Sequence, residues 1–351
     1  MRPQSFSIFL AFLLNTDRPI SGARGPIQDA IQSGAAAEYH REDCIWRKEN
    51  EHHCPDPSVR VYLHNNGKKR IELKYDQHNY SEWLNNNYYD QKREDIFLIH
   101  GYNGGDGKLP MVILRDAYLK NGSYNVFVVD WGELGEAPCY PAAVANLRFI
   151  ASCIAQIVTL LKNVGLSVPR INCVGHSLGA HLCGMLSNYL PFLLFRIFGL
   201  DPAKPLLRPG RPNRLDITDA EFVEVIHTNS GYYGENSREG HVDFCANGGK
   251  NQPFCENAER DKLCSHNWSI CYMADSIDGR SELFAEACSG RCPPTRKIGP
   301  RSSNSLVIGH HTPVTTRGSF CVTTVDSEKF GNNSGMVLLG RICRHIDGPS
   351  P

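Results

Sequence analysis

The sequence has no excess of charge of either sign. Its 351 residues include 37 Lys and Arg against 37 Asp and Glu, so the formal net charge is zero. A chain without net charge has no long-range field that would attract a polyanion. We therefore expect no nucleic-acid partner, and attraction to an anionic membrane would require a local cluster of basic residues.

The sequence also lacks an apolar run long enough to cross a bilayer, which takes about 20 residues. The mostly apolar run Phe6–Leu14 has nine residues, follows Arg2, and precedes the small residues Ser21 and Ala23. This is the pattern of a secretory signal peptide, which predicts that residues 1–23 are removed and that the mature protein is soluble and secreted to the extracellular space.

Cysteine, by contrast, is abundant, with 14 residues. Disulfides persist in oxidising compartments and are reduced in the cytosol, so this number agrees with secretion. Proximity in the sequence predicts local bridges in three pairs: Cys44 with Cys54, Cys255 with Cys264, and Cys288 with Cys292. Cys173 and Cys183 lie in apolar stretches, and we expect them to be buried thiols.

Short apolar runs alternate with helical stretches from about residue 58 onward. The runs are RVYLH, DIFLIH, SYNVFVVDW, RINCVG, LFRIFGLD and EFVEVIHT. From Ala142 to Asn163, apolar residues recur every three or four positions, which predicts a helix that covers a sheet. Strands alternating with helices predict an α/β fold with a mostly parallel central sheet and helices on both faces. The later segment GSFCVTT is expected to add an edge strand.

The stretch CVGHSLGAHLCG places Ser177 between Gly175 and Gly179. A predicted strand precedes Ser177 and a predicted helix follows it, which is the context of a nucleophile elbow. This tight turn forces the serine into an unfavourable backbone conformation and admits only small residues two positions away. Ser177 is therefore a candidate nucleophile, and free N–H groups at the start of the helix favour negative charge beside it.

A catalytic serine needs a histidine to accept its proton and a carboxylate to orient that histidine. With a nucleophile elbow, the acid and then the histidine follow the serine along the chain. Asp201 ends the next predicted strand, at the same edge of the sheet as Ser177, and is the candidate acid. Spacing does not choose the base among the downstream histidines His227, His241, His266, His310 and His311.

The stretch DIFLIHGYNGG ends a predicted strand in a glycine-rich turn. Such a turn is a suitable second source of backbone N–H groups for an oxyanion hole. The candidate donors are the N–H groups of Tyr102 and Leu178.

Taken together, these motifs resemble the pancreatic lipase family, and more narrowly its insect-type extracellular members. Between Asp43 and Asp326 the matching stretches occur in order: IHGYNGG, NVFVVDWGE, CYPAAVAN, VGHSLGAH, FGLDPA, RLDITDAEFVEVIHTNSGYYG, GHVDFCANGG and CSHNWS. The resemblance implies an α/β-hydrolase fold with Ser177 as nucleophile, Asp201 as acid and His266 as base. It divides the chain into an N-terminal extension, residues 24–57, with a local disulfide, and a lipase catalytic domain, residues 58–351.

The same resemblance implies a structural calcium ion at Asp216 and Asp219 of RLDITD, with no cofactor required for catalysis. The alternative is that both residues simply form a turn.

In this family, the segment between the two cysteines before the catalytic histidine is the lid. Here Cys255 and Cys264 enclose only ENAERDKL, in which five of eight residues are charged. Such a lid offers almost no apolar face to an oil surface. The facing loop NSGYYGENSRE is also short and polar, and only 40 residues follow His311. We therefore expect neither the additional β-sandwich of the pancreatic enzymes nor colipase binding.

A short lid and a short facing loop resemble the phospholipases of this family that cleave the sn-1 ester. The resemblance thus implies a secreted phospholipase A1 acting at a lipid surface, with oligomeric state not predicted. One alternative is a neutral triglyceride or galactolipid lipase, and another is a noncatalytic lipid-carrying or yolk-type protein.

Glycosylation sequons occur at Asn79, Asn121, Asn267 and Asn332. Asn267 follows His266, and we expect it to be unmodified.

Overall fold

The computed structural model describes residues 40–65, 69–74, 79–208, 210–256, 260–279, 283–288, 292 and 305–324. The predicted signal peptide and the sequon at Asn332 lie outside these residues.

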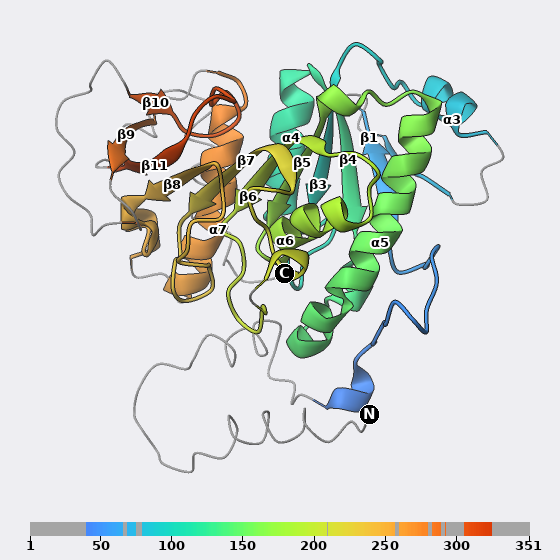
Figure 1. Cartoon of the computed structure of the whole chain (residues 1–351), viewed down its shortest axis with the longest axis horizontal. Coiled ribbons are helices and arrows are strands. Elements are labelled where there is room, and N and C mark those ends of the chain that lie inside the picture. Colours follow the sequence, from blue (N-terminus) through green and yellow to red (C-terminus); the bar gives the residue numbers. More distant parts are fainter. Residues whose placement is uncertain are drawn as a thin grey trace.

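A central 11-stranded sheet organises the described chain (Figure 1). Its order is β10-β9-β11-β8-β7-β6-β5-β3-β4-β1-β2. The strands are β1 (Arg60–His64), β2 (Arg70–Glu72), β3 (Glu94–Ile99), β4 (Tyr124–Asp130), β5 (Ile171–His176), β6 (Leu194–Leu200), β7 (Ala220–His227), β8 (Val242–Ala246), β9 (Phe284–Cys288), β10 (Leu306–Val307) and β11 (Gly318–Val322). Neighbours from β4 through β11 pair in parallel, and the pairs at both ends are antiparallel. The predicted fold class is therefore confirmed.

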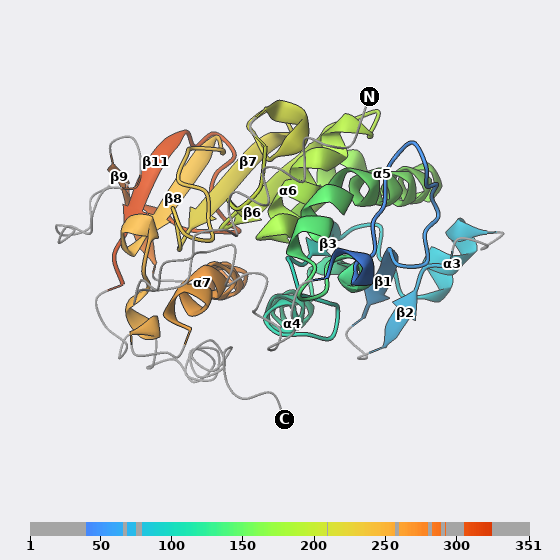
Figure 2. The ribbon, with the colours of Figure 1, turned by 90° about the horizontal axis from the view of Figure 1, so that it is seen from below.

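Helices cover both faces of this sheet. They are α3 (Tyr80–Asn86), α4 (Met111–Asn121), α5 (Tyr140–Val164), α6 (Leu178–Met185) and α7 (Asp261–Ser276). Figure 2 shows α5 and α6 on one side of the sheet and α4 and α7 on the other. Alternate residues of one strand enter the two cores, because successive side chains point to opposite faces. Phe97 of β3 packs in the α5 and α6 core, and Leu98 packs in the α4 and α7 core.

Among the described residues, α5 alone is long and apolar enough to cross a membrane by length and composition. Its 25 residues have a mean hydropathy of 1.7 in the most apolar window, of which 61% is buried inside the molecule. The buried residues pack against α6 and the sheet. A core helix passes the same composition test, and its packing here is that of a core helix.

The predicted local disulfide of the N-terminal extension is wrong. Cys44 is bonded to Cys139, before the start of α5, and Cys54 is bonded to Cys153 in α5. The chain from Cys44 to Cys54 runs alongside α5, so the sulfur atoms that approach each other belong to segments almost 100 residues apart, with sequence separations of 95 and 99. These bonds fasten the extension to the main domain.

Two further disulfide expectations are also corrected. Cys288 pairs with Cys321 and Cys292 with Cys245, because β9 and β8 flank β11 in the sheet. Cys173 and Cys183 are bonded to each other and are not buried thiols. The predicted Cys255–Cys264 bridge is present.

The segment GSFCVTT contains β11, which is not an edge strand as predicted. It pairs with β8 on one side and β9 on the other, because β9 and β10 extend the sheet beyond it. β8 and β9 were missed because the runs VDFCA and FAEAC each carry an acidic residue. That charge interrupts the apolar pattern of a short strand.

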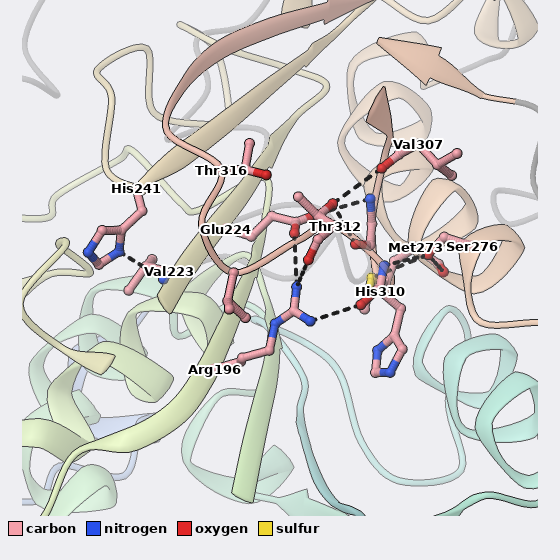
Figure 3. Close-up of polar contacts among 12 residues, drawn as sticks. Arg196, Val223, Glu224, His241, Met273, Ser276, Val307, His310, Thr312 and Thr316 are labelled. Atoms are coloured by element: carbon pink, nitrogen blue, oxygen red, sulfur yellow. Dashed lines mark hydrogen bonds and ion pairs between the residues drawn. The ribbon is translucent and has the colours of Figure 1, made fainter. Parts of the chain in front are cut away.

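A buried ion pair holds the turn after β10 against the sheet (Figure 3). Arg196 of β6 donates to the carbonyl oxygens of His310 and Thr312, at 3.1 and 2.9 Å, and lies 3.5 Å from the carboxylate of Glu224 in β7. Glu224 in turn accepts a hydrogen bond from the N–H of Gly309. Both ends of this turn are thus fixed by charged side chains in the core.

Candidate active site

Ser177 lies on a strained turn between β5 and α6. Its backbone angles are φ 57° and ψ −121°, a region that non-glycine residues rarely adopt. A Cβ on Gly175 would lie 2.2 Å from the carbonyl oxygen of Gly179, and a Cβ on Gly179 would lie 2.1 Å from that of Ile99. Only glycine fits at either position, so the sequence pattern around Ser177 follows directly from the packing of the turn.

Hydrogen bonds between neighbouring strand ends hold the serine and the candidate acid together. The N–H of Ser177 donates to Leu200 O at 3.0 Å, and the N–H of Asp201 donates to Ile226 O at 2.8 Å. These contacts join the carboxyl ends of β5, β6 and β7. Asp201 is fully buried there, although its side chain is a carboxyl group.

Asp201 is bonded to His266 of α7. Its Oδ2 lies 2.6 Å from His266 Nδ1, while its Oδ1 accepts from the N–H groups of Thr228 and Asn229, at 2.8 and 3.0 Å. Every oxygen of the buried carboxylate therefore has partners. A Cβ on Gly234 would lie 2.5 Å from Asp201 Oδ1, so the facing loop closes directly over the acid.

The other candidate histidines have different partners. His227 pairs with Asp243, His241 accepts from the N–H of Val223, His310 contacts Tyr118, and His311 contacts the carbonyl of Ile277. His181, one turn beyond the serine, contacts Ala203 O and Leu215 N. Of the histidines named from the sequence, His266 is the one bonded to Asp201.

Two aromatic neighbours of His266 were not identified from the sequence. The ring of His176 lies 4.6 Å from that of His266, and the ring of Tyr233 lies 5.5 Å from it. Burial, followed by the neighbouring His266, lowers the pKa of His176 well below 6.5. His176 thus supplies a neutral surface against the imidazole. Its place within the elbow was a signal available in the sequence.

The glycine-rich turn after β3 lies against the serine. A Cβ on Gly101 would be 2.7 Å from Ser177 Cβ and 3.3 Å from its Oγ. His100 holds this turn: its Nδ1 lies 2.7 Å from Gly101 O, and its Nε2 accepts from the N–H of Trp131 at 3.0 Å. Tyr102 follows Gly101 directly, and Leu178 is the first residue of α6, where an N–H has no intrahelical acceptor.

The described part of the segment between Cys255 and Cys264 ends in the first residues of α7. The disulfide is formed, and α7 already begins at Asp261, so the last charged residues of the segment are its first turn. Residues 257–259 lie outside the described chain. The exposed positions Arg260 and Asp261 present polar groups to solvent.

Asp216 and Asp219 form a turn. Asp219 accepts from the N–H of Asp216 and from Ser187 Oγ, while Asp216 accepts from the N–H and hydroxyl of Thr218. The described residues contain no group of three or more His, Cys, Asp or Glu side chains arranged to hold a metal. Three of these four carboxylate oxygens accept hydrogen bonds nearby and Asp216 Oδ2 has no partner, an arrangement that fits a turn better than the several convergent oxygens that calcium requires.

Three of the sequons fall on described residues. Asn79 is exposed at the start of α3, whereas Asn121 is half-buried and donates to Ile277 O at 3.0 Å. Asn267 is 6% exposed within α7. A glycan needs open space, which supports our expectation that Asn267 is unmodified.

The central sheet and the strained serine turn define an α/β-hydrolase. The chain belongs to the lipase family, whose model, described as Lipase, matches residues 29–292. Phospholipase A1 of Vespula vulgaris is 32% identical over 268 residues, covering 70% of this chain and 76% of that protein. Phospholipase A1 of Vespula maculifrons is also 32% identical, over 260 residues, covering 70% of this chain and 86% of that protein.

A triacylglycerol lipase is similar at nearly the same level. Pancreatic triacylglycerol lipase of Oryctolagus cuniculus is 31% identical over 287 residues, which cover 73% of this chain and 61% of that protein. Fold and family together make this chain a carboxylic ester hydrolase that acts on lipids.

Proposed function

We propose that the protein is an extracellular phospholipase A1, which hydrolyses the sn-1 acyl ester of phospholipids. The observation that carries this proposal is the short, charged connection from Cys255 into α7. A connection of this size has no amphipathic surface with which to cover the site or to dock on neutral oil. The two Vespula phospholipases, matched over most of their length, support the same substrate class.

The reaction begins with attack of Ser177 Oγ on the acyl carbonyl carbon. With the His266 proton on Nδ1 and bonded to Asp201, Nε2 is left to accept the proton of the serine. The N–H groups of Tyr102 and Leu178 stabilise the negative charge on the carbonyl oxygen. His266 then protonates the departing glycerol oxygen, and the lysophospholipid leaves.

Water completes the cycle. His266 removes a proton from water as the water attacks the acyl carbonyl carbon, and returns it to Ser177 Oγ as the fatty acid leaves. The rings of His176 and Tyr233 pack against the imidazole during both proton transfers.

Positionally labelled phosphatidylcholine tests the proposal. We expect release of the sn-1 fatty acid in preference to the sn-2 fatty acid, and faster turnover of phospholipid than of triglyceride in matched emulsions. Ser177→Ala measures the background. Preferential hydrolysis of triglyceride would contradict the phospholipase assignment and favour the neutral lipase or galactolipid lipase alternative, to which the similarity with the rabbit pancreatic enzyme points.

Covalent labelling distinguishes an enzyme from a lipid carrier on the same fold. A fluorophosphonate reacts with an activated serine, so we expect labelling of the native chain and none of Ser177→Ala. Absence of labelling in a folded native chain would favour a noncatalytic carrier.

Secretion itself is tested by expressing the full sequence and determining the N-terminus of the exported protein, which we expect to follow residue 23.

A further inference from the structure

A basic segment borders the candidate active site. Between Asp201 and Asp216 the sequence has no acidic residue but four basic ones, at Lys204, Arg208, Arg211 and Arg214. In a chain without net charge, this is a local concentration of positive charge of the kind that an anionic surface attracts.

Hydrogen bonds fix the start of this segment beside the catalytic groups. The N–H of Ala203 donates to Ser177 O at 3.3 Å, and that of Lys204 donates to Tyr233 O at 2.7 Å. One residue later, Pro205 O accepts from the hydroxyl of Tyr140 at 3.0 Å. The segment therefore begins directly beside Ser177 and Tyr233, and these hydrogen bonds hold its first residues in place.

Leu206 stands at the surface in an unusual conformation. Its side chain is 37% exposed, and its φ of 62° is in the left-handed region. Asn and Gly adopt this region readily, whereas Leu does so rarely. Neither burial nor backbone preference explains a leucine at this position. Two basic residues flank it: Lys204, which is half-buried, and Arg208, which is exposed.

The cations of the segment are not equally available to a ligand. Arg214 is partly buried and lies 3.9 Å from the carboxylate of Glu235, so much of its charge is balanced within the protein. Lys204 Nζ donates to the carbonyl oxygen of Gly231 at 3.2 Å, and among the described residues no carboxylate forms an ion pair with it. Lys204 and Arg208 are the cations nearest to Leu206 along the chain, and Arg208 is exposed at the surface.

We propose that the segment from Lys204 to Arg208 docks the protein on an anionic lipid surface, with Leu206 entering the apolar layer and Lys204 and Arg208 contacting anionic headgroups. An apolar side chain between cations matches a lipid interface, which has an acyl layer beneath its charged groups. A sulfated polysaccharide offers the charge but no apolar layer for Leu206. The inference rests on the proposed hydrolysis of lipid at Ser177, because it assigns the surface on which that substrate is presented.

Vesicle sedimentation with the full chain carrying Ser177→Ala tests the proposal without hydrolysis. We expect tighter binding to vesicles of phosphatidylcholine with phosphatidylglycerol than to phosphatidylcholine alone, and weaker binding as salt is raised. Arg208→Glu should weaken binding to the anionic vesicles by at least about fivefold, the effect of losing one cation near such a surface. Lys120→Glu, at the exposed end of α4, is the control for charge reversal and should have little effect.

Leu206→Asn separates docking from a structural role. Because Asn favours a positive φ, this variant should melt at the same or a higher temperature and still bind vesicles less tightly. A lower melting temperature with unchanged vesicle binding would overturn the role of Leu206. Equal binding to both vesicle types, or Arg208→Glu behaving like Lys120→Glu, would overturn the proposal.

Heparin binding and hydrolysis in uncharged micelles separate two further outcomes. If Arg208→Glu abolishes binding to heparin but not to vesicles, the segment recognises a polysaccharide and the lipid assignment is wrong. Failure of the native chain to hydrolyse phospholipid in uncharged mixed micelles would contradict the proposed function alone, since vesicle binding is measured with a chain that has no nucleophile.

Discussion

Asp201 and His266, 65 residues apart in the sequence, are joined by a 2.6 Å contact between Oδ2 and Nδ1. The contact brings the carboxyl end of β6 to the second turn of α7. Because Asp201 Oδ1 is held by two backbone N–H groups, the carboxylate cannot turn away from the imidazole. The pair therefore occupies Nδ1 of His266 and leaves Nε2 as the ring nitrogen that is not bonded to the acid.

Replacing the acid should remove activity without unfolding the protein. We expect Asp201→Asn to lower kcat on a soluble short-chain ester by about 10⁴-fold, because an amide does not hold the imidazole in the productive tautomer. Asp216→Asn is the matched control on the same connection and should retain activity. A loss of less than tenfold in Asp201→Asn would contradict the assigned role of this acid.

The turn after β3 should tolerate a methyl group at one glycine and not at another. Gly101→Ala places a Cβ 2.7 Å from Ser177 Cβ, whereas Gly107→Ala meets no atom within 4 Å. We expect Gly101→Ala to abolish ester hydrolysis and fluorophosphonate labelling, and Gly107→Ala to leave both at the native level. Equal activity in the two variants would show that the turn does not approach the nucleophile as closely as described.

Peptide mapping under non-reducing conditions should find the extension bonded to the helix region. We expect Cys44–Cys139 and Cys54–Cys153 peptides and no Cys44–Cys54 peptide. Removing both residues of one such pair should lower the free energy of unfolding by about 4 kcal/mol, since each bond closes a loop of about 100 residues. Recovery of a Cys44–Cys54 peptide from active protein would contradict this connectivity.

Asp95 should make stability depend on pH. Its side chain is fully buried in β3, and burial raises its pKa to about 7, although hydrogen bonds from Asn125 and Tyr89 oppose the shift. The unfolded carboxyl group ionises near pH 4, so unfolding releases a proton between that pH and about 7. The contribution of Asp95 to stability therefore falls as pH rises through this window.

Asp95→Asn removes that titration while keeping a side chain that can accept a hydrogen bond. We expect urea unfolding of the native chain to show a decrease in the free energy of unfolding from pH 4.5 to 7.5 that is smaller in the variant, by up to about 4 kcal/mol. Parallel profiles for the two proteins would indicate that Asp95 is ionised in the folded state throughout.

Several elements could be predicted because their signal is local. The elbow around Ser177 requires glycine at fixed offsets, and the runs that became β3 to β7 are apolar enough to be buried on both faces. The long helix was predicted from its periodicity, from Ala142 to Asn163, and α5 extends this only to Tyr140–Val164. By contrast, β8 and β9 are short and carry charge, so pairing with β11 decides their structure.

The sequence by itself determined the order of the motifs, and with it the lipase family and the residues to consider as nucleophile, acid and base. Local spacing was enough for Ser177, because backbone sterics act between residues two positions apart. The family resemblance named His266 as the base, and the tertiary structure shows its contact with Asp201. Only the tertiary structure decided which cysteines are bonded and where the basic segment lies relative to Ser177. Each of these depends on distances between segments far apart in the chain, which are fixed when the strands assemble at one edge of the sheet.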